Sequence, residues 1–146
     1  MDQLRLVALD SEDLDVLSAH LQDAVLKIGD LSWLKNERRF VLAVNRFVWE
    51  TADSGRRKTY ERRRTALHFD RVRGARAKNL RQGAKDAVVE LLAVRFTETD
   101  APSGEVQLVF AGGGELVLDV ECLEAQMADL GPAWETGARP EHQTDD

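Results

Sequence analysis

Apolar residues recur at every second position over much of this chain, and this spacing predicts strands. Successive side chains on a strand point to opposite faces, so the pattern indicates a sheet with one buried face. Residues 24–34 break their alternation at Gly29, where we expect a bulge. Glycines 112–114 permit positive φ and join the two arms of a hairpin. The seven predicted strands are residues 4–9, 24–34, 40–50, 65–72, 87–99 and the two arms of 105–121.

Two segments have helical spacing instead. Residues 10–24 begin with Asp10, a favourable N-cap, and repeat leucines on one face at positions 14, 17 and 21. Residues 120–132 carry an apolar stripe and end in Gly131 and Pro132, which are typical of a helix C-terminus. We therefore expect one helix after the first strand and a second that caps the sheet. The stripe of the second helix consists of Val120, Leu123, Met127 and Leu130.

This order of elements predicts an α+β fold that is mainly antiparallel. Short turns between successive strands favour antiparallel neighbours, and about seven such strands form a partly open barrel or sandwich. Seven strands with a C-terminal capping helix resemble the pleckstrin-homology-like fold, and a split β-barrel is the alternative. We expect residues 1–134 to form a single β-rich domain and residues 135–146 a polar C-terminal tail. Residues 74–86 have the composition of a loop.

Composition and motifs narrow the class of protein. Hydrophobic residues make up 43% of the 146, which is typical of a globular domain and too apolar for a disordered chain. We find no run long enough to cross a membrane and no signal peptide, so we expect a cytoplasmic protein. Cys122 is the single cysteine and the three histidines are far apart in sequence. The sequence predicts no catalytic residue, metal site or cofactor, and it favours a protein that is not an enzyme while leaving that question open.

Charge is segregated along the chain. Residues 56–85 hold 12 of the 20 lysines and arginines but only two acids, although the net charge of the protein is −6. Such a cluster is typical of contact with an anionic partner, which here is an unknown protein or another anionic ligand. Nucleic acid is a less favoured alternative, because the pI is about 5.1 and no recognition helix lies among the basic residues. The segment can equally fold onto acidic surface of this chain or of a second copy in a homo-oligomer. The hypothetical anion- or partner-binding residues are Arg56, Arg57, Lys58, Arg62, Arg63 and Arg64.

A second hypothesis places a small-ligand or enzyme pocket near His68 and Asp70. These two residues share a strand face, so the carboxylate can orient the imidazole as in an acid/base pair. Asn45 interrupts an otherwise apolar strand and is the third candidate. An exposed histidine beside an aspartate, and the solvated face of a sheet, explain the same residues without a pocket.

Most of the chain, up to about residue 142, resembles one family of small bacterial proteins. The resemblance rests on the stretches LRLVALDSEDLDVLSAHLQDAVLKIGDL, ERRFVLAVNRFVWE, RRRTALHF, PSGEVQLVFAGGGELVLDVECLEAQMADLG and PAWET. They are similar to the proteins grouped as domain of unknown function family 2948. The resemblance implies no activity, cofactor or site residue. Our leading expectation is therefore a non-catalytic binding or adaptor module, which uses the basic segment 56–85 or an open sheet edge.

Overall fold

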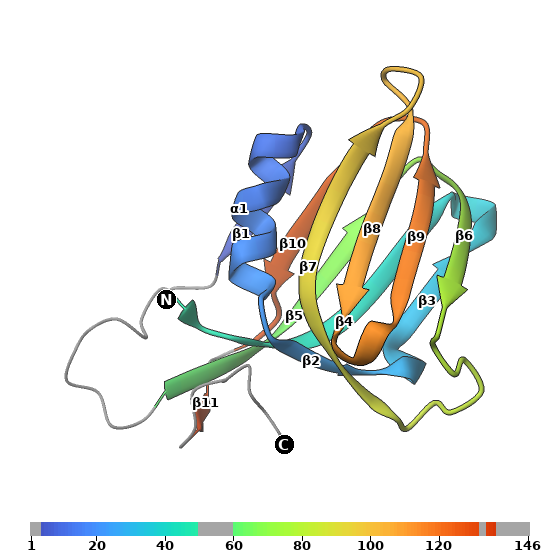
Figure 1. The fold of residues 1–146 in the computed structure, drawn as a ribbon. Helices are drawn as coiled ribbons and strands as arrows, with labels where there is room; N and C mark the ends of the chain where they lie inside the picture. The colour runs from blue at the N-terminus through green and yellow to red at the C-terminus, as the bar shows by residue number, and fades with distance from the viewer. Residues whose placement is uncertain (1–3, 50–59, 132–133, 137–146) are drawn as a thin grey trace.

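The computed structural model describes residues 4–49, 60–131 and 134–136 (Figure 1). In this part of the chain there are eleven strands and one α-helix, α1 (Ser11–Leu21). Three short 3₁₀ turns, η1 (Ile28–Asp30), η2 (Lys35–Glu37) and η3 (Ala111–Gly113), join strands. The strands are β1 (Arg5–Ala8), β2 (Ala24–Lys27), β3 (Leu31–Leu34), β4 (Arg39–Phe47), β5 (Tyr60–Phe69), β6 (Val72–Lys78), β7 (Val88–Glu98), β8 (Gly104–Phe110), β9 (Glu115–Val120), β10 (Ala125–Asp129) and β11 (Trp134–Thr136).

The strands form two antiparallel layers that face each other across the core. One layer has the order β1-β10-β5-β4-β3, and the other has the order β2-β7-β8-β9-β6 (Figure 1). The layers join where β2 pairs with β4, and again where β5 continues into β6 and β9 into β10. At that second corner the Asp70 amide donates to Glu124 O at 2.9 Å and the Glu121 amide to Arg71 O at 3.0 Å. The prediction of a mainly antiparallel, partly open fold is confirmed, whereas the predicted number of about seven strands is too low.

The predicted C-terminal helix is wrong. Residues 125–129 form β10, which hydrogen-bonds to β1 on one side and β5 on the other. The apolar positions of this segment fit either period, because Met127 belongs to a helical stripe and also alternates with buried Ala125. Pairing with two neighbouring strands satisfies the backbone on both sides and decides the outcome. Leu130, part of the predicted stripe, is 57% exposed. Without this helix, the likeness to the pleckstrin-homology-like fold loses its basis.

Two further predictions were wrong at β5 and β6. Strand β5 begins at Tyr60 rather than at residue 65, so Arg62, Arg63 and Arg64 lie within it. Strand β6 includes residues 74–78 of the segment 74–86 that was predicted to be a loop. In this part the inward positions are alanines and the outward ones are charged, so the hydrophobic contrast that reveals a strand is weak. At Gly29 the expected irregularity is present, as η1 rather than a bulge.

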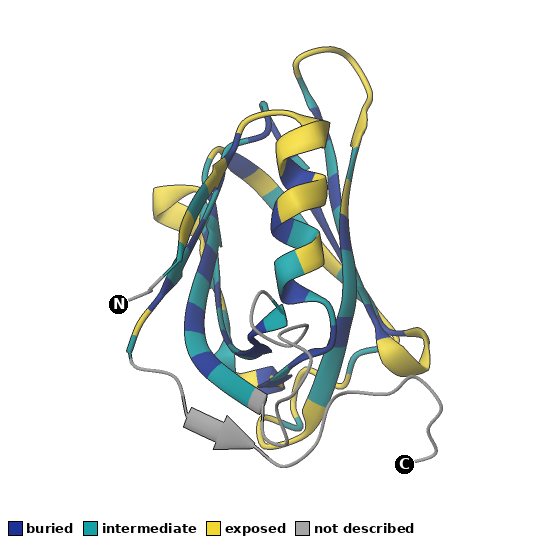
Figure 2. Ribbon diagram, turned by 90° about the vertical axis from the view of Figure 1, so that its left-hand side faces the viewer, coloured by how far each residue is buried: buried dark blue, intermediate teal, exposed yellow. Residues whose placement is uncertain are grey.

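The predicted first helix is confirmed, and it closes one open side of the two-layer structure. Asp10 caps it, because its carboxylate accepts from the Asp13 amide at 2.8 Å. Helix α1 lies between the layers, packed on β7 and β1 (Figure 2). Its buried leucines complete a core made by the inward faces of both layers. These leucines are Leu14, Leu17 and Leu21.

The predicted domain boundary falls near the end of the described residues. Strand β11 pairs with β5, so the sheet extends to Thr136. The remainder of the predicted tail, residues 137–146, lies outside the described residues.

Replacing Leu17 with alanine should destabilise the protein by about 2–5 kcal/mol, because the side chain is fully buried and its loss leaves a cavity. Val16, the residue just before Leu17 on α1, is 51% exposed, so Val16→Ala should change the free energy of unfolding by less than about 0.5 kcal/mol. Urea unfolding measures both. Equal effects of the two substitutions would show that α1 does not close the core.

Candidate functional site

The three described arginines of the predicted binding segment do not share one face. Arg63 points into the core with β5's buried positions, whereas Arg62 and Arg64 point outward. Arg64 donates to Asn45 Oδ1 and to Asp30 Oδ2, both at 3.2 Å. Its guanidinium is thus already paired with polar groups of this chain.

Arg62 lies against the end of β4. It donates to Asn45 O at 3.0 Å, and its guanidinium carbon lies 5.7 Å from the centre of the Phe47 ring. Burial lowers the pKa of the Arg62 guanidinium, although the carboxylates of Glu90 and Asp23 oppose the shift. Arg62 therefore covers Phe47, which is fully buried. The other predicted cations, Arg56, Arg57 and Lys58, lie outside the described residues.

Three further arginines of the basic segment lie beside acids of this chain. Strand β6 pairs antiparallel with β9, which pairs in turn with β8, and this order brings arginines of the segment close to carboxylates from residues far along the sequence. Charge that is segregated in the sequence is therefore interleaved in space. The pairs are Arg71 with Glu124 at 3.1 Å, Arg73 with Asp119 at 3.1 Å and Arg76 with Glu105 at 3.0 Å.

The second set of candidates, Asn45, His68 and Asp70, is only partly brought together. His68 Nε2 lies 3.7 Å from Asp70 Oδ2, and Arg39 donates to the other oxygen of that carboxylate at 2.7 Å. Asn45 pairs across the sheet with Arg64, four residues along β5 from His68. The three side chains therefore do not line one pocket.

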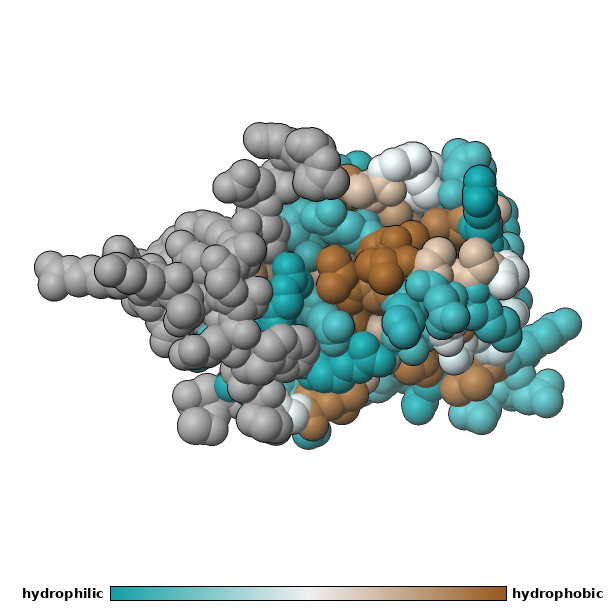
Figure 3. Space-filling view, turned by 90° about the horizontal axis from the view of Figure 1, so that it is seen from below, coloured by the Kyte–Doolittle hydropathy of each residue, from teal (hydrophilic) through white to brown (hydrophobic). Residues whose placement is uncertain are grey.

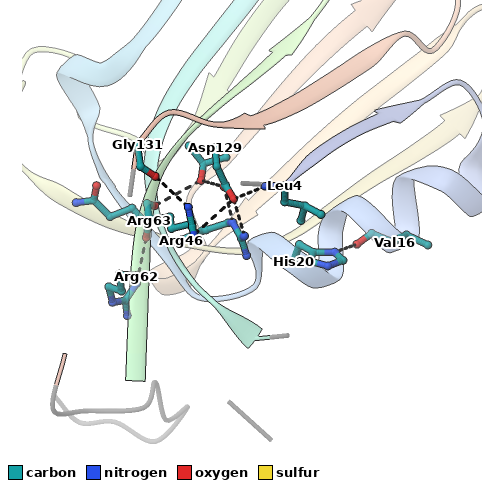
Figure 4. A network of polar contacts seen from close by, with 10 residues as sticks. Leu4, Val16, His20, Arg46, Arg62, Arg63, Asp129 and Gly131 are labelled. Atoms are coloured by element: carbon teal, nitrogen blue, oxygen red, sulfur yellow. Dashed lines mark hydrogen bonds and ion pairs between the residues drawn. The ribbon is translucent and has the colours of Figure 1, made fainter. Parts of the chain in front are cut away.

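A buried ion pair that the sequence analysis did not identify joins β4 and β10 (Figure 4). The guanidinium of Arg46 donates from Nε and Nη2 to the two oxygens of Asp129, each at 2.9 Å. Thr65 and the Leu4 amide donate to the same carboxylate at 2.8 Å. The side chains of Arg46 and Asp129 are both 0% exposed.

The ionisation of Asp129 follows from these contacts. Burial acts to raise its pKa, but the hydrogen bonds from Arg46, the Leu4 amide and Thr65 outweigh burial and hold the pKa below its usual value. Arg63 lies beside the pair and donates to Gly131 O at 3.1 Å. The Asp129 carboxylate is fully buried and already accepts from all these donors, so no substrate can contact it. The ion pair is therefore structural. The feature of the sequence that indicated this ion pair was Arg46, which occupies an inward position of an alternating strand.

The second open side of the two-layer structure, opposite α1, contains a cavity. Among the described residues β3 pairs only with β4, and β6 only with β9, so these two strands border an open seam. At one end the seam is tied by the Val72 amide, which donates to Arg38 O at 2.9 Å. Farther along, the strands enclose a cavity of about 300 Å³. It is lined by Ile28, Gly29, Leu31, Trp33, Phe40, Ala75, Arg76, Ala77, Leu80, Gln82, Lys85 and Leu116.

The loop between β6 and β7 forms one wall of this cavity and is held in place at both ends. Asn79 donates to Gly113 O at 3.2 Å, and the Gly29 amide donates to Lys85 O at 2.9 Å. Leu80 packs so closely on Gly114 that a Cβ there would lie 2.6 Å from its side chain. Glycine at position 114 therefore allows the Leu80 side chain to pack here and form part of the cavity wall.

The cavity has an apolar floor and a polar rim. Trp33 and Phe40 stack with ring centres 6.2 Å apart, and Ala75 and Ala77 of β6 are too small to fill the space opposite them. Viewed from below, apolar groups gather in the middle of the surface with hydrophilic groups around them (Figure 3). The polar members of the lining are Arg76, Gln82 and Lys85.

Comparison with protein families places the chain in one of them. Residues 4–142 match the family described as "Protein of unknown function (DUF2948)", so the protein belongs to this family, as the sequence resemblance indicated. Neither the curated proteins nor the solved structures contain a match to the chain. In the part of the chain that the structure describes, no helix has the length and apolar character needed to span a membrane.

The stability contributed by Asp129 should depend on pH. Its pKa is lower in the folded protein than in the unfolded chain, so the stabilisation is complete well above the usual aspartate pKa of about 3.9 and is lost as the pH falls through and below that value. Asp129→Asn should cost about 3–5 kcal/mol at pH 7, because Arg46 stays buried without its counter-ion. Urea unfolding between pH 7 and pH 2.5 should show a shallower decline for this variant. Parallel pH curves for the variant and the unmodified protein would contradict this.

Arg63→Gln should lower stability by about 1–3 kcal/mol, since it removes a hydrogen bond to Gly131 O from a residue that is only 8% exposed. Arg73→Gln is the matched control: its ion pair with Asp119 is well exposed, and its loss should change stability by less than about 0.5 kcal/mol. Thermal and urea unfolding report both. An effect of Arg63→Gln no larger than the control would show that Arg63 is available to a partner.

Proposed function

We propose that this protein is a non-catalytic binding module whose small ligand occupies the cavity between β3 and β6. The observation that carries the proposal is this preformed cavity on the open side of the fold, with apolar walls and a few polar groups at its rim. Ligand sites in proteins commonly have this construction.

The volume of the cavity limits the size of the ligand. Its volume of about 300 Å³ is at the lower end for ligand sites. At roughly 30 Å³ for each water-sized group, it accommodates about ten non-hydrogen atoms. A small molecule fits, and a folded partner or a nucleotide does not.

The chemistry of the lining supports binding rather than catalysis. Among the described residues, the lining contains no carboxylate, imidazole, thiol or hydroxyl group, and Lys85 is its one side chain of a type used in acid–base or nucleophilic catalysis. Such catalysis usually needs a second group that activates or orients the first, and the described lining residues offer none beside Lys85. The described residues also contain no cluster of three metal-ligating side chains.

The basic segment supports an anionic macromolecular partner less well. Arg63 is buried in the core, Arg64 is paired with Asp30, and Arg73 is paired with Asp119. Nucleic-acid binding draws on cations that neutralise phosphates, and these arginines already contact groups of their own chain. We therefore place the ligand at the cavity and not on β5.

A cavity-filling substitution tests the proposal. Ala77→Leu adds bulk to a lining position, whereas Ala128→Leu adds the same bulk to an outward position on β10. With 1-octanol as the probe, the methyl NMR signals of Ile28, Leu80 and Leu116 should shift saturably in the unmodified protein. Affinity should fall at least about tenfold in Ala77→Leu, a loss of roughly 1.4 kcal/mol, and stay unchanged in Ala128→Leu.

Two results would contradict the proposal. One is equal binding of 1-octanol by Ala77→Leu and the unmodified protein. The other is the absence of any saturable shift at the three lining residues, with both variants still folded by circular dichroism.

A further inference from the structure

We infer that the ligand of this cavity is a small amphipathic anion, a monocarboxylate whose apolar body lies on Trp33 and Phe40 and whose carboxylate faces Lys85. The inference rests on the proposed function and goes beyond it by naming the chemical class of the ligand. Charge complementarity at the rim and the apolar floor are the two observations behind it.

The charge of the lining has one sign. Arg76 and Lys85 are its two ionisable residues within the described part of the chain, and both are cationic. Arg76 is already paired with Glu105 at 3.0 Å, so most of its charge is compensated. Among the described residues nothing forms a hydrogen bond or ion pair with the Lys85 ammonium group. The cavity therefore presents about one unbalanced positive charge, which matches a single carboxylate.

The position of Lys85 is set by its backbone. Its carbonyl accepts from the Gly29 amide at 2.9 Å, and two residues later Ala87 O accepts from the Ile28 amide at 2.9 Å. A Cβ added at Gly29 would lie 3.2 Å from the Lys85 Cβ, so the two segments are in close contact. The loop thus holds the backbone of Lys85 at one point on the rim, and its side chain lines the cavity from there.

The apolar part of the lining suits a hydrocarbon. Trp33 and Phe40 provide adjacent ring surfaces, and Leu116 and Ile28 complete an apolar floor. A ligand with a charge at each end would leave one of them against this floor without a partner, which is unfavourable. An alkyl or aryl carboxylate of about ten non-hydrogen atoms satisfies both ends and the volume.

Gln82 is a second polar group of the lining. It lies three residues before Lys85 on the same loop. A carboxylate has two oxygens, so it can accept from an amide N–H as well as from an ammonium group. The lining therefore offers donors for both oxygens of a carboxylate.

Three probes with the same eight-carbon chain and different head groups test the inference. Octanoate, 1-octanol and octylammonium should be titrated into the unmodified protein, Lys85→Gln and the control Lys78→Gln, with the methyl signals of Leu80 and Leu116 as readout. Lys78 is exposed on β6 and does not line the cavity. In the unmodified protein octanoate should bind about three- to tenfold more tightly than 1-octanol, and octylammonium should bind most weakly, as expected for one charge pair at a solvated rim.

The variants separate this inference from the proposed function. Lys85→Gln should abolish the preference for octanoate over 1-octanol, and Lys78→Gln should keep it. If octanoate and 1-octanol bind equally to the unmodified protein, or if Lys85→Gln keeps the preference for octanoate, the inference is wrong while the binding function stands. If all three probes fail to shift the lining signals, the proposed function is wrong too.

Discussion

The hydrogen-bonded pair of Arg46 and Asp129 holds one layer of this protein in a single register. It connects β4 with β10, and the same carboxylate also accepts from Thr65 on β5 and from the Leu4 amide just before β1. A slip of β10 by one residue would turn Asp129 outward and leave a buried guanidinium without its counter-ion. Four strands, two of them from near the two ends of the chain, thus have one compatible alignment, and the apolar positions of β10 then point into the core.

The two-layer arrangement also accounts for the unusual distribution of charge. Antiparallel pairing places the basic strand β6 beside β9, and Arg73 meets Asp119 as a result. The corner between the layers pairs Arg71 with Glu124 in the same way. Arginines of the basic segment 56–85 are therefore neutralised by carboxylates from later in the chain, and the net negative charge of the protein is compatible with its arginine-rich segment.

Local signals in the sequence were sufficient for some elements and insufficient for others. Helix α1 was predictable because Asp10 caps it and its leucines repeat on one face, and the β8–β9 hairpin because its arms alternate clearly about the three glycines. Strand β10 was not, since Met127 fits both periods and only its neighbours decide between them. The cavity could not be predicted from the sequence either. Trp33 and Lys85 come from separate segments, and the small alanines of β6 indicate a cavity only once the fold places them in its lining with Trp33.

The two open sides of the fold are closed differently, and this determines where a bound molecule would be exchanged. Helix α1 covers one side with its buried leucines, whereas the cavity lies on the other side, at the seam between β3 and β6. In the binding module that we propose, the ligand is therefore exchanged at this seam, away from α1. The contact between Gly29 and Lys85 holds the loop between β6 and β7 at the edge of the seam, so it limits how far this loop can move during exchange.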